Sequence, residues 1–300
     1  MVSGARPQVD GAPDIDAGID ISATADPALQ RLAELMAGKS RVLLLCGAGL
    51  GTGSGIPDYR DRDGVRRGNA PIQGPDFRAS AALQRRYWAR SMVGWPTLAR
   101  ATPNAGHHAI AALQASGRVA GVVTQNVDGL QQRTGPGPLL ELHGNIHRVA
   151  CMACGERSSR ATLQQRLLAD NPALAALDAP ALPDGDALLE PAALAGFRLP
   201  RCTVCGGPLT PDVVFFGDGV PPATTATAQQ WVAEADALLV VGSSLMVFSG
   251  YRLCTLAAGA GMPLLAINLG KTRADHLLTV KAELVAEQAL PALAALLQAG

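Results

Sequence analysis

Four of the six cysteines stand in two C-x-x-C pairs, Cys151 with Cys154 and Cys202 with Cys205. Cysteine thiolates at this spacing bind zinc, and four of them complete a tetrahedron with no open position. The metal would therefore stabilise the fold rather than take part in catalysis. A redox dithiol is the alternative for a single pair, and the presence of two pairs argues against it. The sequence predicts one structural zinc ion.

A glycine-rich segment from Gly47 to Gly55 follows a short apolar run. Glycines at a strand end let the backbone approach a phosphate, and a following helix adds its positive N-terminus. The strict G-x-G-x-x-G fingerprint is not met, because Thr52 occupies the position of the last glycine. No acidic residue ends a second strand about 20 positions on, as a dehydrogenase requires. The segment leaves a tight turn and a dinucleotide site open, and it argues against a dehydrogenase.

Polar side chains follow two further apolar runs. Gln125, Asn126 and Asp128 offer amide and carboxylate groups to sugar hydroxyls, although Asn and Asp also favour turns. His143 follows the next run, and imidazole titrates near neutrality, so it can take up and return a proton. Taken alone, a histidine here is more often a loop residue with its hydrogen bonds satisfied, and only the surrounding motifs favour catalysis.

These residues need a scaffold, and the periodicity predicts one. Apolar runs typical of buried strands alternate with helical stretches such as 102–116, 223–235 and 248–260. The expected strands are 41–46, 119–124, 139–142, 213–216, 237–241 and 263–268. This alternation predicts an α/β fold with a doubly wound, parallel, Rossmann-like sheet. Ligands bind at the carboxyl ends of such strands, where the polar loops lie.

Two segments break the alternation and predict an inserted smaller lobe. A helical part covers 62–100, with an interruption expected near Gly94–Pro96, and a zinc module covers 149–210. The large lobe would consist of 26–61, 101–148 and 211–300, after a disordered tail over 1–25. The Pro-rich stretch 170–200 is expected to be a long loop, partly covering the substrate channel.

The composition restricts the class of protein. Lys and Arg total 25, as do Asp and Glu, so the net charge is zero. A dedicated nucleic-acid binder usually has a basic excess. The N-terminus lacks the apolar core of a secretory signal. The sequence contains no run of about 18 apolar residues, so no membrane span is predicted. We expect a cytoplasmic monomer with no nucleic-acid or membrane partner.

Several motifs together resemble those of the sirtuins, the NAD-dependent protein deacylases. The segment 47–60 resembles their NAD loop, 124–128 their nicotinamide-ribose loop and His143-Gly-Asn their catalytic histidine motif. The cysteine pairs match the zinc module, and 211–217 resembles the peptide-binding strand. Gly242–Ser244 and Asn268 match the adenosine-side loops. These motifs follow the family order over residues 27–300.

The resemblance implies that NAD is a co-substrate and that an acylated-lysine protein or peptide is the partner. His143 would deprotonate a ribose hydroxyl, with Asn126 as a second catalytic residue. The implied peptide residues are Val214, Phe215 and Phe216, on an edge strand to which a peptide adds. The implied NAD-binding residues are Gly47, Ala48, Gly49, Thr52, Ile56, Pro57, Asp58, Tyr59, Arg60, Gln125, Asn126, Asp128, Gly242, Ser243, Ser244, Asn268, Gly270 and Ala286.

Finer features concern the subfamily and the acyl group. The segments 87–96, 183–186 and 241–251 resemble class II sirtuins. The spacing of Tyr87 and Arg90 resembles the Tyr-x-x-Arg of acid-selective sirtuins, which would favour acyl groups ending in a carboxylate. A solvated helix face is the alternative for Arg90. Mono-ADP-ribosyl transfer and a non-catalytic NAD-sensing module are the alternative functions.

Overall fold

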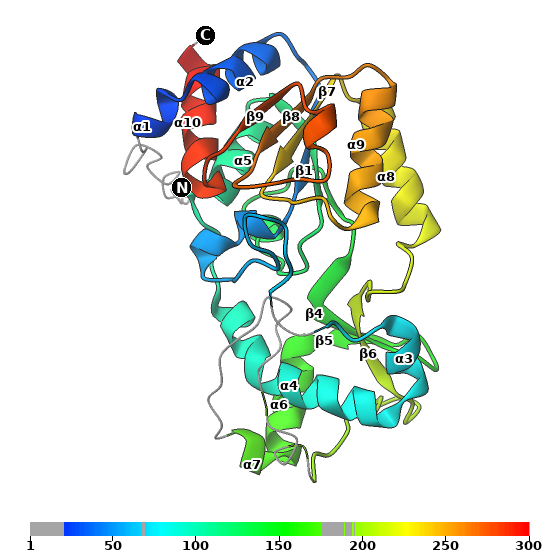
Figure 1. The fold of residues 1–300 in the computed structure, drawn as a ribbon. Coiled ribbons are helices and arrows are strands. Elements are labelled where there is room, and N and C mark those ends of the chain that lie inside the picture. Colours follow the sequence, from blue (N-terminus) through cyan, green and yellow to red (C-terminus); the bar gives the residue numbers. More distant parts are fainter. Residues whose placement is uncertain (1–20, 68–69, 176–188, 190–193, 195, 300) are drawn as a thin grey trace, which may run out of the picture.

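The computed structural model describes residues 21–67, 70–175, 189, 194 and 196–299, which form two lobes (Figure 1). The large lobe contains a six-stranded sheet in the order β3-β2-β1-β7-β8-β9, parallel throughout. Its strands are β1 (Val42–Cys46), β2 (Val119–Thr124), β3 (Leu139–Glu141), β7 (Ala237–Val241), β8 (Leu264–Ile267) and β9 (Val280–Ala282). From β1 the chain proceeds outward to β3, then returns beside β1 as β7 and proceeds to β9. The strand order therefore reverses between β1 and β7, which is where such sheets bind ligands.

Helices cover both faces of this sheet (Figure 1). One face carries α2 (Pro27–Ala37), α5 (Ala105–Ala115) and α10 (Ala286–Ala299), and the other carries α8 (Pro222–Glu234) and α9 (Phe248–Gly259). Every residue of β1 and β7 is buried, because alternate side chains enter the two apolar cores. The predicted doubly wound α/β fold is confirmed.

The small lobe combines helices with a three-stranded antiparallel sheet in the order β5-β4-β6. Its elements are α3 (Gly74–Ala79), α4 (Ala81–Arg100), β4 (Gly144–Cys151), β5 (Arg157–Ser159), α6 (Arg160–Asp170), α7 (Pro172–Ala175) and β6 (Leu209–Val213). Trp88 on α4 is fully buried, and its indole N–H donates to the carbonyl of Leu209 at 3.2 Å. Because β4 pairs with β6 from residue 144 onward, 144–148 and 211–213 belong to the small-lobe sheet rather than to the large lobe.

Helix α4 differs from the sequence expectation, because it continues through Pro96 without the interruption predicted at 94–96. Proline has no N–H, so the carbonyl of Met92 lacks its helical partner. The side-chain amide of Gln164 on α6 donates to that carbonyl at 2.7 Å and replaces the missing bond. The break falls instead at Ser80, whose extended backbone separates α3 from α4 and whose hydroxyl caps α4.

Three other boundaries differ. Asn104 caps α5 through a capping box with His107, so the helix begins at Ala105 rather than at 102. Strand β6 ends at Val213, where the sequence predicted a strand to begin. Within the expected tail, α1 (Ile21–Thr24) is helical because Ala23 packs into the core of the large lobe.

Some elements were not predicted, and some expectations remain untested. The short strand β9 and helix α10 complete the sheet edge and one core. The 3-10 turns η3 (Gln131–Arg133) and η5 (Asp275–Leu277) lie in connections. Most of the Pro-rich stretch, at 176–188, 190–193 and 195, lies outside the described residues. Across the part of the chain that is described, no helix combines the length and apolar character that a membrane span needs.

Candidate active site

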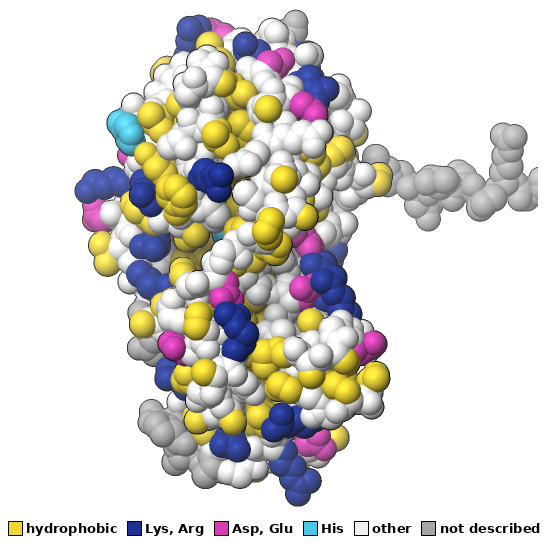
Figure 2. Space-filling model, turned by 90° about the vertical axis from the view of Figure 1, so that its right-hand side faces the viewer, with side chains coloured by type: hydrophobic (Ala, Val, Ile, Leu, Met, Phe, Trp, Pro, Cys, Tyr) yellow, Lys and Arg dark blue, Asp and Glu magenta, His cyan; other side chains and the backbone are white. Residues whose placement is uncertain are grey.

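A cleft of about 830 Å³ lies between the lobes, along the carboxyl ends of β1, β2 and β7. Figure 2 shows the hollow between the two halves of the molecule, with hydrophobic and basic side chains around it. Every predicted NAD-binding residue except Gly270 lines this cleft, as do His143, Tyr87 and the segment 214–216. Gly270 packs instead against the backbone of Arg62, 2.2 Å from where a Cβ would stand. Residues spread over 240 positions of the sequence thus meet at one site.

The glycine-rich segment forms two short 3-10 turns, η1 (Ala48–Leu50) and η2 (Thr52–Ser54), rather than leading directly into an α-helix. A Cβ at Gly47 would lie 2.6 Å from Cβ of Ser243, and one at Gly49 would lie 2.9 Å from Cα of Gly242. Glycine therefore lets the loops after β1 and β7 touch at the switch point. Backbone hydrogen bonds close this contact, from Gly47 to Val241 at 2.9 Å and from Gly49 to Gly242 at 2.8 Å.

The loop after β2 brings amide and carboxylate groups to the same place. The side-chain amide of Asn126 donates to the carbonyl of Gly47 at 3.0 Å, and that of Gln125 donates to the hydroxyl of Ser243 at 2.9 Å. Asp128 is 8% exposed and accepts from the backbone of Leu130 at 2.9 Å. Burial raises the pKa of its carboxyl. These bonds hold the polar groups at the cleft wall before any ligand binds.

His143 lies in the short loop between β3 and β4, immediately before β4, and lines the cleft. Its Nδ1 lies 3.0 Å from the carbonyl oxygen of Gln125. A carbonyl only accepts, so Nδ1 carries the proton and the neutral ring presents Nε2 as a base. Burial lowers the pKa of His143, and the Gln125 carbonyl opposes this effect. The ring is therefore neutral at physiological pH and able to accept a proton.

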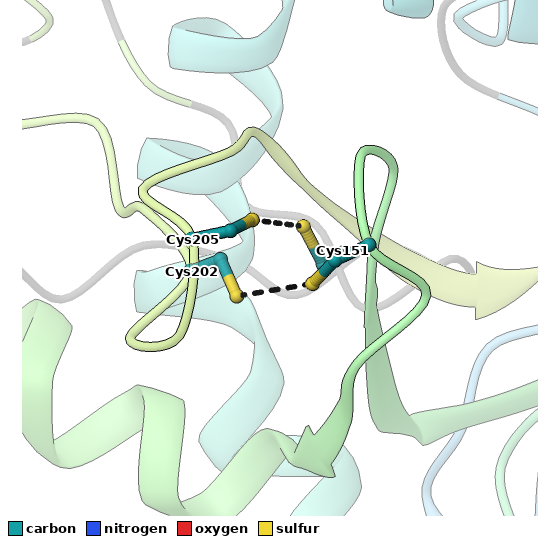
Figure 3. A group of neighbouring side chains, drawn as sticks. Cys151, Cys202 and Cys205 are labelled. Carbon is teal, nitrogen blue, oxygen red and sulfur yellow. Dashed lines mark hydrogen bonds between the residues drawn. The ribbon is translucent and has the colours of Figure 1, made fainter.

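The four predicted metal ligands meet at one corner of the small lobe. Their sulfur atoms all lie within 4.8 Å of one another. Figure 3 shows Cys151 facing Cys202 and Cys205 across the space between two loops. The Sγ atoms of Cys151 and Cys205 are 3.5 Å apart, which is too long for a disulfide. Backbone N–H groups of Ala153 and Val204 point at the sulfurs of Cys151 and Cys202 at 3.4 Å, as they do around thiolates.

The predicted peptide residues follow β6, which is an edge of the small-lobe sheet. The ring of Phe215 stacks on Phe77 at 4.8 Å between centroids, inside the small lobe. Phe216 is 37% exposed, and the Arg66 guanidinium lies 5.0 Å from its ring centroid. The two side chains therefore alternate inward and outward, as they do in a strand.

The two residues expected to select the acyl group lie differently on α4. Tyr87 lines the cleft and contacts the ring of Phe215 at 5.7 Å between centroids. Arg90 is 7% exposed and lies outside the set of lining residues, so a solvated helix face, the alternative for this residue, is wrong. The carboxylate clamp itself stays a prediction.

Comparison with known proteins decides the family. The sequence profile of the Sir2 family matches residues 47–249, about two thirds of the chain. The chain belongs to the Sir2 family. The sirtuin resemblance seen in the motifs is therefore confirmed, while the class II detail stays a prediction.

Related proteins and solved structures match most of the chain. An "NAD-dependent protein deacetylase 3" of Pseudomonas syringae pv. tomato is 51% identical over 267 residues, covering 89% of this chain and 95% of the relative. An "NAD-dependent protein deacetylase 2" of Bradyrhizobium diazoefficiens is 48% identical, covering 87% and 96%. A structure from "Structural Basis for the Mechanism and Regulation of Sir2 Enzymes" aligns with a TM-score of 0.72 at 30% identity, covering 91% of this chain and 98% of the other. The structure "Sir2-p53 peptide-NAD+" aligns with a TM-score of 0.68 at 26% identity, covering 87% and 95%.

The residues present fit both groups that the sirtuin family implies. The cleft has the volume and the polar wall for a dinucleotide, and the cysteine cluster offers four soft ligands and no open position. The predictions of NAD as co-substrate and of a structural zinc site are confirmed at this level. Zinc would be held by Cys151, Cys154, Cys202 and Cys205, away from the cleft.

The sequence analysis missed one side chain that touches the base. Ser249 lines the cleft, and its hydroxyl lies 2.8 Å from Nε2 of His143. The two residues are 106 positions apart, and no local spacing connects them. Ser249 stands inside the segment 241–251, whose resemblance pointed to a subfamily without giving this residue a role.

Proposed function

We propose that this sirtuin is an NAD-dependent protein-lysine deacylase, either a deacetylase or a deacylase of longer or acidic acyl groups. The observation that supports it is the imidazole of His143, whose Nδ1 contacts a backbone carbonyl and whose Nε2 lies in a cleft between the glycine-rich loop and the peptide strand. Relatives at about half identity over nearly their full length are named NAD-dependent protein deacetylases. The products would be nicotinamide, O-acyl-ADP-ribose and free lysine.

Side chains in the cleft would take separate roles in the reaction. NAD would supply an electrophilic ribose carbon, C1′, at which the acyl oxygen displaces nicotinamide. Asn126 and Asp128 would position the ribose, and Nε2 of His143 would take a proton from a ribose hydroxyl. The loops after β1 and β7 touch each other, and together with the cleft walls they would hold the reacting groups in place. This removes much of the entropy cost of bringing NAD and the acyl-lysine together.

The backbone beyond β6 can bind an extended peptide. Val214 N–H donates to His143 at 2.9 Å, and the carbonyl of Phe216 accepts from Gly74 at 2.8 Å. Among the backbone hydrogen bonds of the described residues, the N–H group of Phe215 and the carbonyl of Val214 have no partner. These two groups belong to one trans peptide unit and point in opposite directions, so a peptide strand that carries the acyl-lysine would pair with the one that faces the cleft. A solved Sir2 structure was obtained with a p53 peptide and NAD.

The first experiment incubates the protein with NAD and a panel of acylated-lysine peptides. We expect nicotinamide release to depend on the peptide, with one deacylated peptide formed per nicotinamide, measured by chromatography and mass spectrometry. A peptide with unmodified lysine is the control. ADP-ribose attached to a protein without loss of acyl groups would instead establish the transferase alternative, and NAD binding without turnover would establish the sensing module.

The acyl selectivity is tested at Arg90. If Tyr87 and Arg90 clamp a carboxylate, Arg90→Met should cost about 1.5–3 kcal/mol of transition-state binding on glutaryl-lysine, the weight of a charged hydrogen bond. Activity on acetyl-lysine should stay unchanged. Arg85→Met, an exposed position on the same helix, is the control. Equal losses on both substrates would assign Arg90 a structural role and remove the acid-selective prediction.

A further inference from the structure

The catalytic histidine has two hydrogen-bond partners, one at each ring nitrogen. Gln125 O accepts from Nδ1 at 3.0 Å, and the Ser249 hydroxyl contacts Nε2 at 2.8 Å. Because Nδ1 holds the proton of the neutral ring, Nε2 has a lone pair and the Ser249 hydroxyl donates to it. Nε2 is the atom that the proposed function assigns as the base. Ser249 therefore touches the reacting nitrogen itself.

The chain holds Ser249 in place with a tightly built turn. Leu245, four residues earlier, has φ +57°, a conformation that costs free energy in a non-glycine residue. It is fully buried, and its N–H donates to the Ser243 hydroxyl at 3.2 Å. This turn directs the chain into α9, whose first turn carries Ser249.

Gly250 fixes the distance between α9 and the loop that holds the ring. A Cβ at this position would lie 2.6 Å from Oε1 of Gln125, so a larger residue would displace the end of the Gln125 side chain. Gln125 is itself anchored, through its side-chain amide, to Ser243 and to the carbonyl of Cys46. The residue that accepts from Nδ1 and the helix that carries Ser249 are thus packed on each other around His143.

A hydroxyl suits a group that changes its protonation state. It donates to the bare Nε2 of the neutral ring, and after rotation its oxygen accepts from the Nε2–H of the imidazolium. We propose that Ser249 is a positioning residue for His143, holding Nε2 by donation in the neutral base and by acceptance once the ring has taken up a proton. The inference rests on the proposed function because it gives His143 the role of base.

In the proton transfer to His143, each bond that breaks is matched by one that forms. A ribose hydroxyl takes the position of the Ser249 hydroxyl at Nε2, its O–H bond breaks, and an N–H bond forms at Nε2. The ribose oxygen keeps the electron pair with which it attacks the acyl carbon. The Ser249 oxygen then accepts the new N–H and holds the imidazolium until the proton is returned.

This arrangement predicts how Ser249 affects the titration of His143. A hydrogen bond from a charged donor is about twice as strong as a neutral one, so Ser249 stabilises the imidazolium more than the neutral ring. Removing its hydroxyl should therefore lower the pKa of His143 further. The neighbouring elements add other charges to the cleft: Arg252 on α9, Asp128 after β2, Asp218 after β6, Lys271 after β8, and arginines and aspartates between 58 and 67. All of these stay the same in the variant.

The test begins with the protein alone. Ser249→Ala, Ser249→Thr and wild type are titrated by nuclear magnetic resonance with ¹⁵N-labelled histidine, and the His143 signals are assigned with His143→Gln. We expect a lower pKa for His143 in Ser249→Ala and a restored value in Ser249→Thr. Superimposable titrations of wild type and Ser249→Ala would overturn the proposal, whatever the enzyme's activity.

Kinetics provide the second measurement. In Ser249→Ala the acidic limb of kcat/KM should move to lower pH by the same amount, and kcat should fall about tenfold with KM for NAD unchanged. Ser249→Thr should restore both. Thr255→Ala is the matched control, because that hydroxyl lies on the same helix and donates to the carbonyl of Arg252 at 2.8 Å. A fall in kcat without a shift of the acidic limb, not rescued by threonine, would also overturn the proposal. If wild type itself fails to deacylate, the proposed function fails, while the titration still decides on Ser249.

Discussion

Replacing His143 by alanine should lower the deacylation rate by about 10²–10⁴-fold, the usual contribution of a general base. The ring lies at the cleft wall with Nε2 as its unprotonated nitrogen, and no other histidine lines the cleft among the described residues. NAD binding should remain detectable by calorimetry, because the loops after β1, β2 and β7 that form the binding wall are held by contacts independent of His143. His108→Ala, an exposed position on α5, is the control.

The pH dependence follows from the same residue. Burial lowers the pKa of His143 below its ordinary value of 6.5. The base must be unprotonated, so activity is present above the folded-state pKa and is lost as the pH falls through it. We therefore expect the acidic limb of kcat/KM to lie below pH 6.5. Normal turnover by His143→Ala, or an acidic limb well above that pH, would contradict the assignment of His143 as base.

The sequence predicted the parts of the site that local signals define. The apolar run 42–46 and the glycines after it indicated a strand end with a ligand loop, and the structure places them at the switch point. The two C-x-x-C pairs predicted a metal site because four cysteine thiolates at this spacing are typical zinc ligands. In both cases the chemistry depends on residues a few positions apart, which a single sequence can show.

What the sequence could not predict depends on contacts between distant segments. Pro96 suggested a helix break, but Gln164, from another helix, satisfies the carbonyl that proline leaves open. Ser249 contacts His143 from 106 positions further along the chain, on a helix whose Gly250 packs against the side chain of Gln125. The spacing of Tyr87 and Arg90 suggested a common role, but tertiary packing, which leaves Arg90 7% exposed, decides which of the two lines the cleft. Such contacts override local propensity, and they cannot be predicted from the periodicity of one sequence.

The zinc site supports the second prediction with a large effect. Cys151 and Cys202 belong to the small-lobe core together with Phe77, Trp88 and Tyr87. Binding of a structural zinc ion contributes folding free energy directly, because the ligands come together only in the folded chain. Removing one ligand by Cys151→Ser leaves three thiolates close together without full neutralisation by the metal. The small lobe should then lose several kcal/mol of stability.

We therefore expect Cys151→Ser, or treatment with a strong chelator, to lower the melting temperature by about 5–10 °C. Deacylation should fall with it, because Tyr87 and Phe215 line the cleft from the same lobe, whereas NAD affinity should change less, since its predicted binding residues belong mainly to the large lobe. Cys254→Ala is the matched control: this thiol is buried on α9 away from the cluster, and its variant should keep one zinc ion per chain in elemental analysis. Zinc-free protein that is fully active and melts at the same temperature would contradict the prediction. In Cys151→Ser the melting temperature and the zinc content should fall together, whereas in Cys254→Ala any fall in melting temperature should leave the zinc content unchanged. This difference separates the effect of the metal from that of a core substitution.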